Sequence, residues 1–258
     1  TTTLGFEGSD LTASLVGAAL DVADIQIWKD VDGFMTADPK MVAEAKQVDK
    51  LSFEESAELA YFGAQVLHPR AVYPAMEKKI NILVKNVLRP TEQGTLICVN
   101  TSQRKDVLKS VSYLKKVATL KVFGTGAGYK TGFLSDTSQC LAESGINIYS
   151  ATTSQTCVAF LIDQANAKRA KQLLESLLGG YYERIEILEN TALVCAVGAG
   201  LGSTRGIAAR VFNAVANEGV NVDLISAGAS TVAYHFTVDK KDLQKAIRAI
   251  HAEFFDKT

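Results

Sequence analysis

Glycine-rich loops that lead into helices are the parts of this sequence best suited to chemistry. The chain opens on one such loop, Thr1–Asp10, which runs into an expected small-residue helix at Leu11–Leu20. The first turn of a helix presents free N–H groups and a partial positive charge, so this arrangement suits an anion. The glycines could also serve only to turn the chain.

Two acidic residues follow the first buried strand that the sequence predicts. Ala23–Trp28 reads as that strand, and Lys29–Gly33 forms the loop leaving its carboxyl end, with Asp30 and Asp32 inside it. Open α/β sheets keep their ligands at this edge. The loop is therefore a candidate ligand site, although both acids could instead be solvated loop residues.

A third candidate is the turn Gly124–Thr131, which comes within one residue of a phosphate-binding P-loop. Tyr129 stands where that motif requires glycine. A related turn further along the chain carries Ser203–Arg205 at the corresponding place and no lysine. Both turns lead directly into the first turn of a helix, and such a helix start can bind a small carboxylate as well as a phosphate.

The two turns belong to an internal duplication. Five glycines recur with a constant offset of 74 positions: 124, 126, 128, 132 and 145 become 198, 200, 202, 206 and 219. In the same register, Gly145–Ile148 (GINI) is matched by Gly219–Val222 (GVNV). A constant offset over five glycines indicates a repeated structural unit.

Each copy of the repeat predicts the same order of elements within about 70 residues. Hydrophobic patterning predicts strands at 118–123, 146–152 and 157–163 in the first copy, and at 192–197, 220–226 and 232–238 in the second. The helices are expected at 132–143, 165–178, 206–218 and 241–254. This order is typical of the ferredoxin-like βαββαβ fold, which belongs to the α+β class.

The first 100 or so residues have a different, α/β character. Ser52 and Glu55 form a capping box for a helix that should reach about Gly63. Further elements are expected as a helix at 71–77, a strand at 80–86, a turn at 89–94 and a short strand at 95–99. His68 before Pro69 is expected to act as a structural cap.

Composition excludes several classes of partner. The formal net charge is −1, and Lys/Arg residues form nothing longer than short pairs such as Lys115–Lys116, so we expect neither nucleic acid nor a membrane as partner. Four cysteines without a C-x-x-C pair and three histidines without ligand spacing predict no metal site. The start lacks a signal-peptide pattern, which favours a cytoplasmic location, and the missing initiator Met suggests a fragment.

The duplicated half resembles the ACT domains, βαββαβ modules that pair side by side and hold a free amino acid at their interface. The resemblance rests on Gly132–Leu134, on Gly206–Ile207 and on the two GINI/GVNV junctions. It implies that paired modules protect a sheet edge and enclose an effector site. The implied effector residues are Gly132, Phe133, Leu134, Ile148, Tyr149, Ser154, Gln155, Gly206, Ile207, Asn221 and Val222.

The first half resembles the C-terminal part of the catalytic domain of aspartate kinases, within the amino-acid kinase family. Three segments carry this resemblance: Thr2–Asp10 (TTLGFEGSD), Lys29–Lys40 (KDVDGFMTADPK) and Phe62–Pro69 (FGAQVLHP). It implies a kinase part at 1–104 and a first ACT domain at 117–190, inserted into a second made of 105–116 and 191–258.

The resemblance implies transfer of the ATP γ-phosphoryl group to the side-chain carboxylate of L-aspartate, with Mg²⁺ accompanying ATP. The product would be 4-phospho-L-aspartate, used for lysine, threonine and methionine synthesis. A carboxylate is already a competent nucleophile, so positioning and charge neutralisation would be the main tasks of the protein. By resemblance, the substrate and catalytic loop contains Gly8, Ser9 and Asp10, and the nucleotide side contains Asp30, Gly33, Lys40, Gln65 and Val66.

Several positions depart from the family pattern. Phe6 replaces an arginine, Glu7 a glycine and Gln65 a lysine, and the family's N-terminal lysine-glycine-glycine loop is absent from this chain. We therefore expect no turnover by the fragment alone, and a non-catalytic amino-acid-sensing subunit is the rival reading. The effector is expected to be lysine or threonine, because Tyr149 and Gln155 replace the acidic residues of lysine-sensitive members. A homo-oligomer through the ACT domains is also expected.

Overall fold

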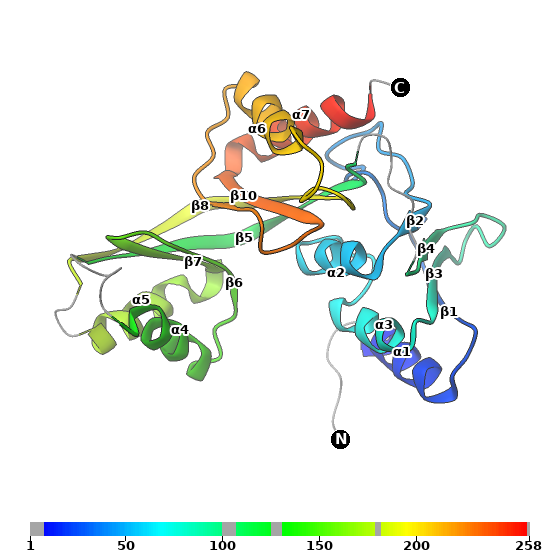
Figure 1. Cartoon of the computed structure of the whole chain (residues 1–258), viewed down its shortest axis with the longest axis horizontal. Coiled ribbons are helices and arrows are strands. Elements are labelled where there is room, and N and C mark those ends of the chain that lie inside the picture. Colours follow the sequence, from blue (N-terminus) through cyan, green and yellow to red (C-terminus); the bar gives the residue numbers. More distant parts are fainter. Residues whose placement is uncertain (1–7, 100–106, 125–130, 179–181, 257–258) are drawn as a thin grey trace.

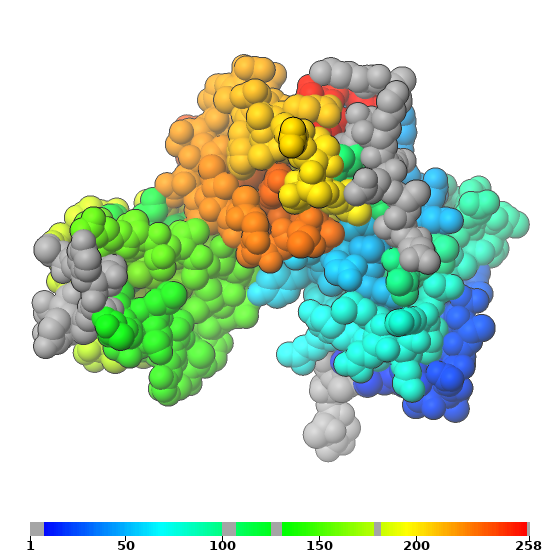
Figure 2. Space-filling model, viewed as in Figure 1, coloured from blue at the N-terminus to red at the C-terminus, as the bar shows by residue number. Residues whose placement is uncertain are grey.

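Two β-sheets organise the protein. The computed structural model describes residues 8–99, 107–124, 131–178 and 182–256. One sheet has four strands and the other has six. Figure 1 shows the smaller sheet with its helices on one side of the molecule and the larger sheet extending away from it. In Figure 2 the two ends form lobes on either side of a hollow.

The four-stranded sheet has the order β1-β3-β4-β2. β1 runs parallel to β3, β4 runs antiparallel to β3, and β2 runs parallel to β4. The strands are β1 (Asp24–Lys29), β2 (Lys50–Leu51), β3 (Asn81–Asn86) and β4 (Thr95–Ile97). The accompanying helices are α1 (Gly8–Leu20), α2 (Phe53–Tyr61), the 3-10 turn η1 (Pro69–Ala71) and α3 (Val72–Lys78).

The start of α2 is fixed by the predicted capping box. Ser52 Oγ accepts the N–H of Glu55 at 3.1 Å, and Glu55 Oε2 accepts the N–H of Ser52 at 2.7 Å. This reciprocal pair satisfies two helix-start donors that would otherwise be buried without partners. The prediction for α1 was wrong by three residues, because this helix begins at Gly8 and not at Leu11.

The six-stranded sheet has the order β6-β7-β5-β8-β10-β9. Its strands are β5 (Ser110–Phe123), β6 (Ile148–Thr153), β7 (Cys157–Asp163), β8 (Arg184–Val197), β9 (Ile225–Ser226) and β10 (Ala233–Asp239). Its helices are α4 (Phe133–Glu143), α5 (Ala167–Leu178), α6 (Ile207–Asn217) and α7 (Leu243–Phe255), with the short turns η2 (Gln164–Asn166) and η3 (Lys240–Asp242). The two central strands are antiparallel and each has 14 residues.

The long central strands correct the sequence prediction, which placed separate strands at 118–123 and 192–197. The first part of β5, Ser110–Leu114, pairs with Leu193–Val197, and the last part of β5 pairs with Arg184–Leu188. Each long strand therefore serves both copies of the duplication. Polar residues near the middle, such as Lys115 and Lys116, interrupt the apolar pattern and hide this continuity in the sequence.

The strand predicted at 220–226 is also shorter than expected, since only Ile225–Ser226 pairs as β9. Ahead of it, the N–H of Leu224 donates to the side-chain hydroxyl of Thr237 at 2.9 Å. A side chain thus takes a backbone donor that a regular strand would give to its neighbour.

Both copies nevertheless follow the ferredoxin-like order, which confirms the predicted fold class. We call the elements between Val117 and Asn190 the first repeat. The second repeat consists of the elements from Thr191 onward together with Ser110–Leu114, which supply its fourth strand. Figure 1 shows α4 and α5 against one face of the sheet at one end, and α6 and α7 against the opposite face at the other end.

The second repeat packs on the first half of the chain through both of its faces. Along β8, Ala192, Val194 and Ala196 belong to the core beneath α6 and α7. The alternate residues Leu193, Cys195 and Val197 belong to the core that also contains β1, α2 and β3. The period of two in a strand explains how β8 joins two cores at once. The two halves of the chain therefore share hydrophobic cores.

No helix in the described ranges is both long enough and apolar enough to cross a bilayer.

Candidate functional site

Asp10 brings three segments of the first half together. Its carboxylate is buried, with 4% of the residue exposed. Asp10 Oδ2 lies 2.8 Å from Lys29 Nζ and accepts the N–H of His68 at 3.2 Å. The start of α1, the end of β1 and the turn before η1 therefore meet at one carboxylate. Beside it, Gly8 is half-buried and Ser9 is exposed, while Phe6 and Glu7 lie outside the described residues.

The two acidic residues in the loop after β1 have different surroundings. Asp30 is exposed. Asp32 Oδ1 accepts the amide of Asn86 at 2.7 Å, and its other oxygen pairs with Arg89. Gly33 has φ +105°, and a Cβ there would lie 2.5 Å from the hydroxyl of Thr95. Asp32 and Gly33 therefore shape the loop, and Asp30 is the acid left facing solvent.

The next segment, Thr36–Lys40, is held by the six-stranded sheet and its helix α7. Thr36 Oγ1 lies 3.0 Å from Nε2 of His251 on α7, and Tyr113 on β5 donates its hydroxyl to Asp38 Oδ2 at 2.7 Å. Burial, followed by the neighbouring Asp38 carboxylate, raises the pKa of Tyr113 far above its usual range, so it stays a donor. Lys40 is exposed at the end of the segment. Movement of α7 or β5 would therefore reach this segment directly.

The Thr36–His251 contact predicts acid sensitivity. Burial lowers the pKa of His251 below its ordinary value of 6.5, only partly opposed by Asp256. The folded state thus favours the neutral ring, and its contribution is present above the unfolded pKa and lost as pH falls through the folded pKa. His235 is shifted in the same direction by burial.

We expect the free energy of unfolding to fall between about pH 7.5 and about pH 5. The decrease should be smaller in His251→Gln, which cannot titrate, and urea melts across this range measure the difference. Glu77→Gln, which removes an exposed carboxylate on α3, is not expected to flatten the profile. Equal slopes for wild type and His251→Gln would contradict the assignment.

Gln65 and Val66 lie in the short connection between α2 and η1. Gln65 is exposed and Val66 is half-buried, with its N–H bonded to Ala64 O at 2.8 Å. No hydrogen bond or ion pair within the described ranges joins either residue to Asp30 or Lys40. Their link to the candidate catalytic loop runs through His68 and its bond to Asp10.

The glycine turns of the two repeats adopt the same conformation at the helix start. Gly132 precedes α4 with φ +88° and Gly206 precedes α6 with φ +83°. The left-handed region suits glycine, which has no Cβ to clash with the following carbonyl. After each glycine the next residue, Phe133 or Ile207, is buried, while Leu134 is 43% exposed. Gly126, Gly128, Tyr129 and Lys130 lie outside the described residues.

The two turns do not meet within one chain. Ser110 pairs with Val197, and Phe123 pairs with Arg184, so the carboxyl ends of β5 and β8 lie at opposite ends of the sheet. Fourteen residues of strand separate them by roughly 40 Å. The expectation that the repeats of one chain close around a shared site is therefore wrong, because the shared central strands are antiparallel.

The remaining predicted effector residues divide between these ends. Ser154 and Gln155 are exposed in the β6–β7 turn, next to the first glycine turn, since the Gly124 N–H donates to Thr156 O at 3.0 Å. Ile148 and Tyr149 begin β6, where the Tyr149 ring lies 5.6 Å from that of Tyr61. In the second repeat, the predicted residues are the exposed Asn221 and the half-buried Val222, and Val222 corresponds to Ile148.

A buried ion pair that the sequence did not reveal joins the segment before β5 to α2. Glu55 is 0% and Lys109 is 3% exposed, and Lys109 Nζ lies 2.7 Å from Glu55 Oε2. The second oxygen, Oε1, accepts the N–H of Ala199 at 2.6 Å in the turn after β8. The sequence showed Glu55 only as a cap. The sequence signal for the partner of Glu55 was that Lys109 stands between the apolar residues Val107–Leu108 and Val111.

The other end of α2 rests on the six-stranded sheet. The ring of Phe62 lies 4.8 Å from His235 on β10, and Tyr61 OH accepts the amide of Asn147 at 3.0 Å, just before β6. His235 Nε2 lies 3.2 Å from Ser150 Oγ on β6. α2 therefore contacts both repeats and leads directly into the Gln65–Val66 connection.

Within the described ranges, no cluster of three or more His, Cys, Asp or Glu side chains is arranged to hold a metal ion.

Comparison with known families defines the class of protein. The profile of the amino acid kinase family matches residues 1–86, and that of the ACT domain matches residues 194–254. The fold agrees, with an α/β half followed by two ferredoxin-like repeats. The chain thus combines a segment of the amino acid kinase family with an ACT domain.

Comparison with individual relatives identifies the family within this class. Aspartokinase 1, chloroplastic, from Arabidopsis thaliana is 36% identical over 261 residues, which are 99% of this chain and 46% of that protein. The chain belongs to the aspartokinase family. It spans about half the length of the curated aspartokinases that it matches.

Solved structures agree with this assignment. Aspartate kinase from Clostridium acetobutylicum superposes with a TM-score of 0.90 at 29% identity, covering 98% of this chain and 59% of that one. E. coli aspartokinase III matches in its complex with aspartate and ADP (TM-score 0.85, 31% identity) and in its complex with lysine and aspartate (0.82, 33%), each covering 98% of this chain and 57% of that one. The regulatory subunit of aspartate kinase from Thermus thermophilus covers 57% of this chain and 98% of its own (0.54, 27%).

Proposed function

We propose that this chain supplies the nucleotide-side half of an aspartate kinase together with its amino-acid-sensing part. The reaction is transfer of the ATP γ-phosphoryl group to L-aspartate, giving 4-phospho-L-aspartate and ADP, the first step toward lysine, threonine and methionine. The observation that carries the proposal is the meeting of three family segments at Asp10. The complex of E. coli aspartokinase III with aspartate and ADP supports it.

In this proposal each segment has a distinct task. The N–H groups at the start of α1, at Gly8 and Ser9, receive an anionic group of the substrate. Asp10 is a positioning residue, because its carboxylate is already engaged by Lys29 and His68. The nucleotide side is formed by Asp30, Gly33, Lys40, Gln65 and Val66.

Mg²⁺ fits this arrangement as an ion carried by the ATP phosphates. Magnesium commonly uses one or two carboxylates plus substrate phosphates, and Asp30 is an exposed carboxylate at the carboxyl end of β1. The ion would neutralise phosphate charge during transfer.

We propose the following division of the chain: a kinase part at 1–104, a first ACT domain at 117–190, and a second ACT domain formed by 105–116 and 191–258. The pairing of Ser110–Leu114 with Leu193–Val197 supports the discontinuous second domain. In this division, the chain that leaves the kinase part forms the fourth strand of the second ACT domain.

We further propose that lysine or threonine binds at the glycine turn before α4, with its carboxylate on the helix start. Of the predicted first-repeat residues, Gly132–Leu134, Ser154 and Gln155 belong to this end of the sheet, whereas Ile148 and Tyr149 lie at the other end of β6. Because the second turn lies at the far end of the sheet, a second copy of the chain would be needed to complete an enclosed site. This supports a homo-oligomer, and a cytoplasmic location remains a prediction.

We expect the isolated chain to show no aspartate kinase turnover. Apolar side chains on α1 and β1 are exposed, with Leu20 at 70%, Val16 at 51% and Trp28 at 43%, as on a surface that another part of an enzyme covers. A coupled assay of ADP release, with L-aspartate present and absent, measures this. Aspartate-dependent turnover at the rate of an ordinary kinase, about 1 s⁻¹ or more, would contradict the expectation.

Effector binding is tested by calorimetric titration of the folded chain with lysine and with threonine. Saturable binding of one of them is expected, and Gly132→Val should abolish it by filling the turn. Gly206→Val, the same change in the second repeat, is the matched control. Binding of neither amino acid by the folded wild type would remove support for the sensing role.

A second candidate is a non-catalytic sensing subunit. It is favoured by the match of 57% of this chain to the regulatory subunit of aspartate kinase from Thermus thermophilus. Under this alternative, effector binding would persist while no extension of the chain restored turnover.

A further inference from the structure

A cleft lies between α2 and the second repeat, apart from the two glycine turns. It has a volume of about 310 Å³ and is lined by eight residues. They come from α2 and its end, from α3, from the loop before β10 and from β10 itself: Ala57, Glu58, Tyr61, Phe62, Tyr73, Ala229, Ser230 and His235. This volume lies at the lower end of the range for small-molecule sites.

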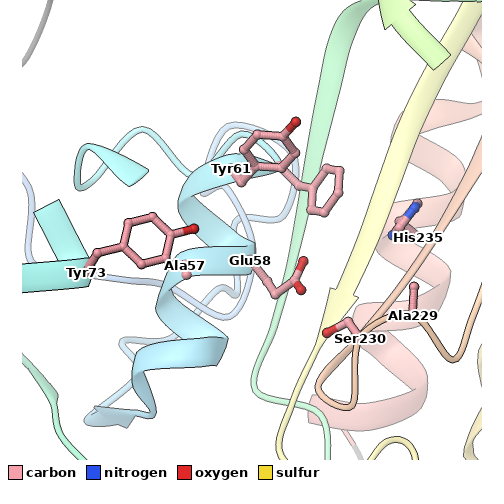
Figure 3. A pocket seen from close by; sticks show the side chains of 8 residues that line it. Ala57, Glu58, Tyr61, Tyr73, Ala229, Ser230 and His235 are labelled. Atoms are coloured by element: carbon pink, nitrogen blue, oxygen red, sulfur yellow. The ribbon is translucent and has the colours of Figure 1, made fainter. Parts of the chain in front are cut away.

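The only charged side chain in the lining is the carboxylate of Glu58. Figure 3 shows it leaving α2 toward the side of the cleft formed by Ala229, Ser230 and His235. Within the described ranges, no Lys, Arg or His nitrogen lies close enough to form an ion pair with it, although the residue is only half-exposed. Its negative charge also contributes, after burial, to raising the pKa of the nearby Cys195 thiol.

Aromatic rings also line the cleft. Tyr61 and Tyr73 are 38% and 54% exposed, and Figure 3 shows Tyr73 beside Ala57, on the other side of α2 from Glu58. The rings of Phe62 and His235 lie with their centroids 4.8 Å apart. Burial lowers the pKa of His235, so its ring is neutral at pH 7 and adds no positive charge. The cleft thus combines one carboxylate with aromatic faces and no cation in its lining.

Such a combination selects a cation. Aromatic faces attract ammonium groups, and a carboxylate forms charge-assisted hydrogen bonds with them. We propose that this cleft binds a small primary ammonium compound, with its charged group between Glu58 and the ring of Tyr61, three residues further along α2. The site lies between the kinase half and the regulatory half, so the ligand would contact both. It is independent of the proposed kinase reaction and of the effector turns.

The probe is 5-amino-1-pentanol, and its neutral analogue 1,5-pentanediol tests the need for charge. Binding is followed by proton–carbon NMR of the imidazole groups, since the chain has three histidines and only His235 lines the cleft. A His235→Gln variant assigns the signal. We expect a saturable shift of the His235 signal with the amine, with His68 and His251 unchanged.

Glu58→Gln should weaken binding about tenfold or more, because it removes the charge while keeping the shape. The helix bond from the Phe62 N–H to Glu58 O uses the backbone and is retained in this variant. Glu54→Gln, an exposed change on the same helix outside the cleft, is the matched control and should bind as wild type does.

Any of three results would overturn the proposal. The first is the absence of any saturable shift of His235 in the folded wild type. The second is equal binding of the diol and the amine, and the third is unchanged binding in Glu58→Gln. None of these results would bear on the kinase assay. Lysine also carries a primary ammonium group, so its titration is repeated in Glu58→Gln, and lysine binding that persists in this variant belongs to the effector turn and not to the cleft.

Discussion

Replacing Lys109 by Met is expected to destabilise the protein by about 3 to 5 kcal/mol. The substitution leaves the Glu55 carboxylate, 0% exposed, without its cation at 2.7 Å. Its hydrogen bonds to the N–H groups of Ser52 and Ala199 remain but do not neutralise the charge. Urea unfolding at neutral pH, analysed by linear extrapolation, measures the loss.

The control is Lys121→Met, which removes a lysine of the same sheet from a more open pair. Lys121 and Asp223 lie 2.8 Å apart with side chains 24% and 39% exposed, so we expect a loss below about 1 kcal/mol. A second variant, Glu55→Gln combined with Lys109→Met, should recover part of the stability because no charge is left buried. A loss of under about 1 kcal/mol for Lys109→Met itself would mean that the pair does not hold α2 to the regulatory sheet.

The second large effect is expected for Gly63→Ala, with a loss of about 3 kcal/mol or more. Gly63 has φ +104°, and a Cβ there would lie 2.0 Å from the carbonyl oxygen of Tyr113 in β5. Neither backbone can move freely, because α2 and β5 are each packed into a shared core. Thermal and urea unfolding of the folded variant measure the loss.

Gly145→Ala measures the cost of the left-handed backbone without a steric clash. Gly145 also has a positive φ, +69°, but nothing lies within 4 Å of a Cβ placed on it. We expect a loss of only about 1 to 2 kcal/mol, from the left-handed backbone alone. Equal losses at the two positions would show that the close approach of Gly63 to β5 is not maintained in solution.

Both predictions concern the same physical feature, the attachment of the first half of the chain to the six-stranded sheet. α2 is held at its start by Glu55 and at its end by Phe62, while Thr36 and Asp38 are held by His251 and Tyr113. These contacts are short and most are buried. They provide a route by which a shift in the regulatory sheet would change the candidate nucleotide side.

Local signals in the sequence predicted most of the fold. The capping box at Ser52 and Glu55, the glycines at 132 and 206 and the constant offset of the repeat each depend on neighbouring residues. Such features are visible without tertiary structure because the partners lie a few positions apart.

What the sequence did not predict depends on partners far apart in the chain. The continuity of β5 and β8 through polar residues, and the resulting separation of the two turns, follow from a pairing register between distant strands. The Glu55–Lys109 pair joins residues 54 positions apart, and the Thr36–His251 contact joins residues 215 apart. No local pattern identifies which lysine or histidine will meet a given buried acid or hydroxyl.

The same distinction applies to the candidate site. The sequence indicated Asp10 as a loop residue of the site, and the structure shows its carboxylate committed to Lys29 and His68. Asp30 and Asp32 look alike in the sequence, yet only Asp32 is held, by Asn86 and Arg89. Burial and long-range contacts, which the sequence does not display, separate a positioning residue from one that faces a ligand.

Calorimetric unfolding of the whole chain most directly tests whether the kinase half and the regulatory sheet form one body. Because the core around β1, α2 and β3 contains Cys195, Val197 and Ala233 of the second repeat, we predict a single cooperative transition. Its calorimetric and van't Hoff enthalpies should agree. Two separated transitions, with the first half unfolding independently of the sheet, would contradict the shared core on which this account rests.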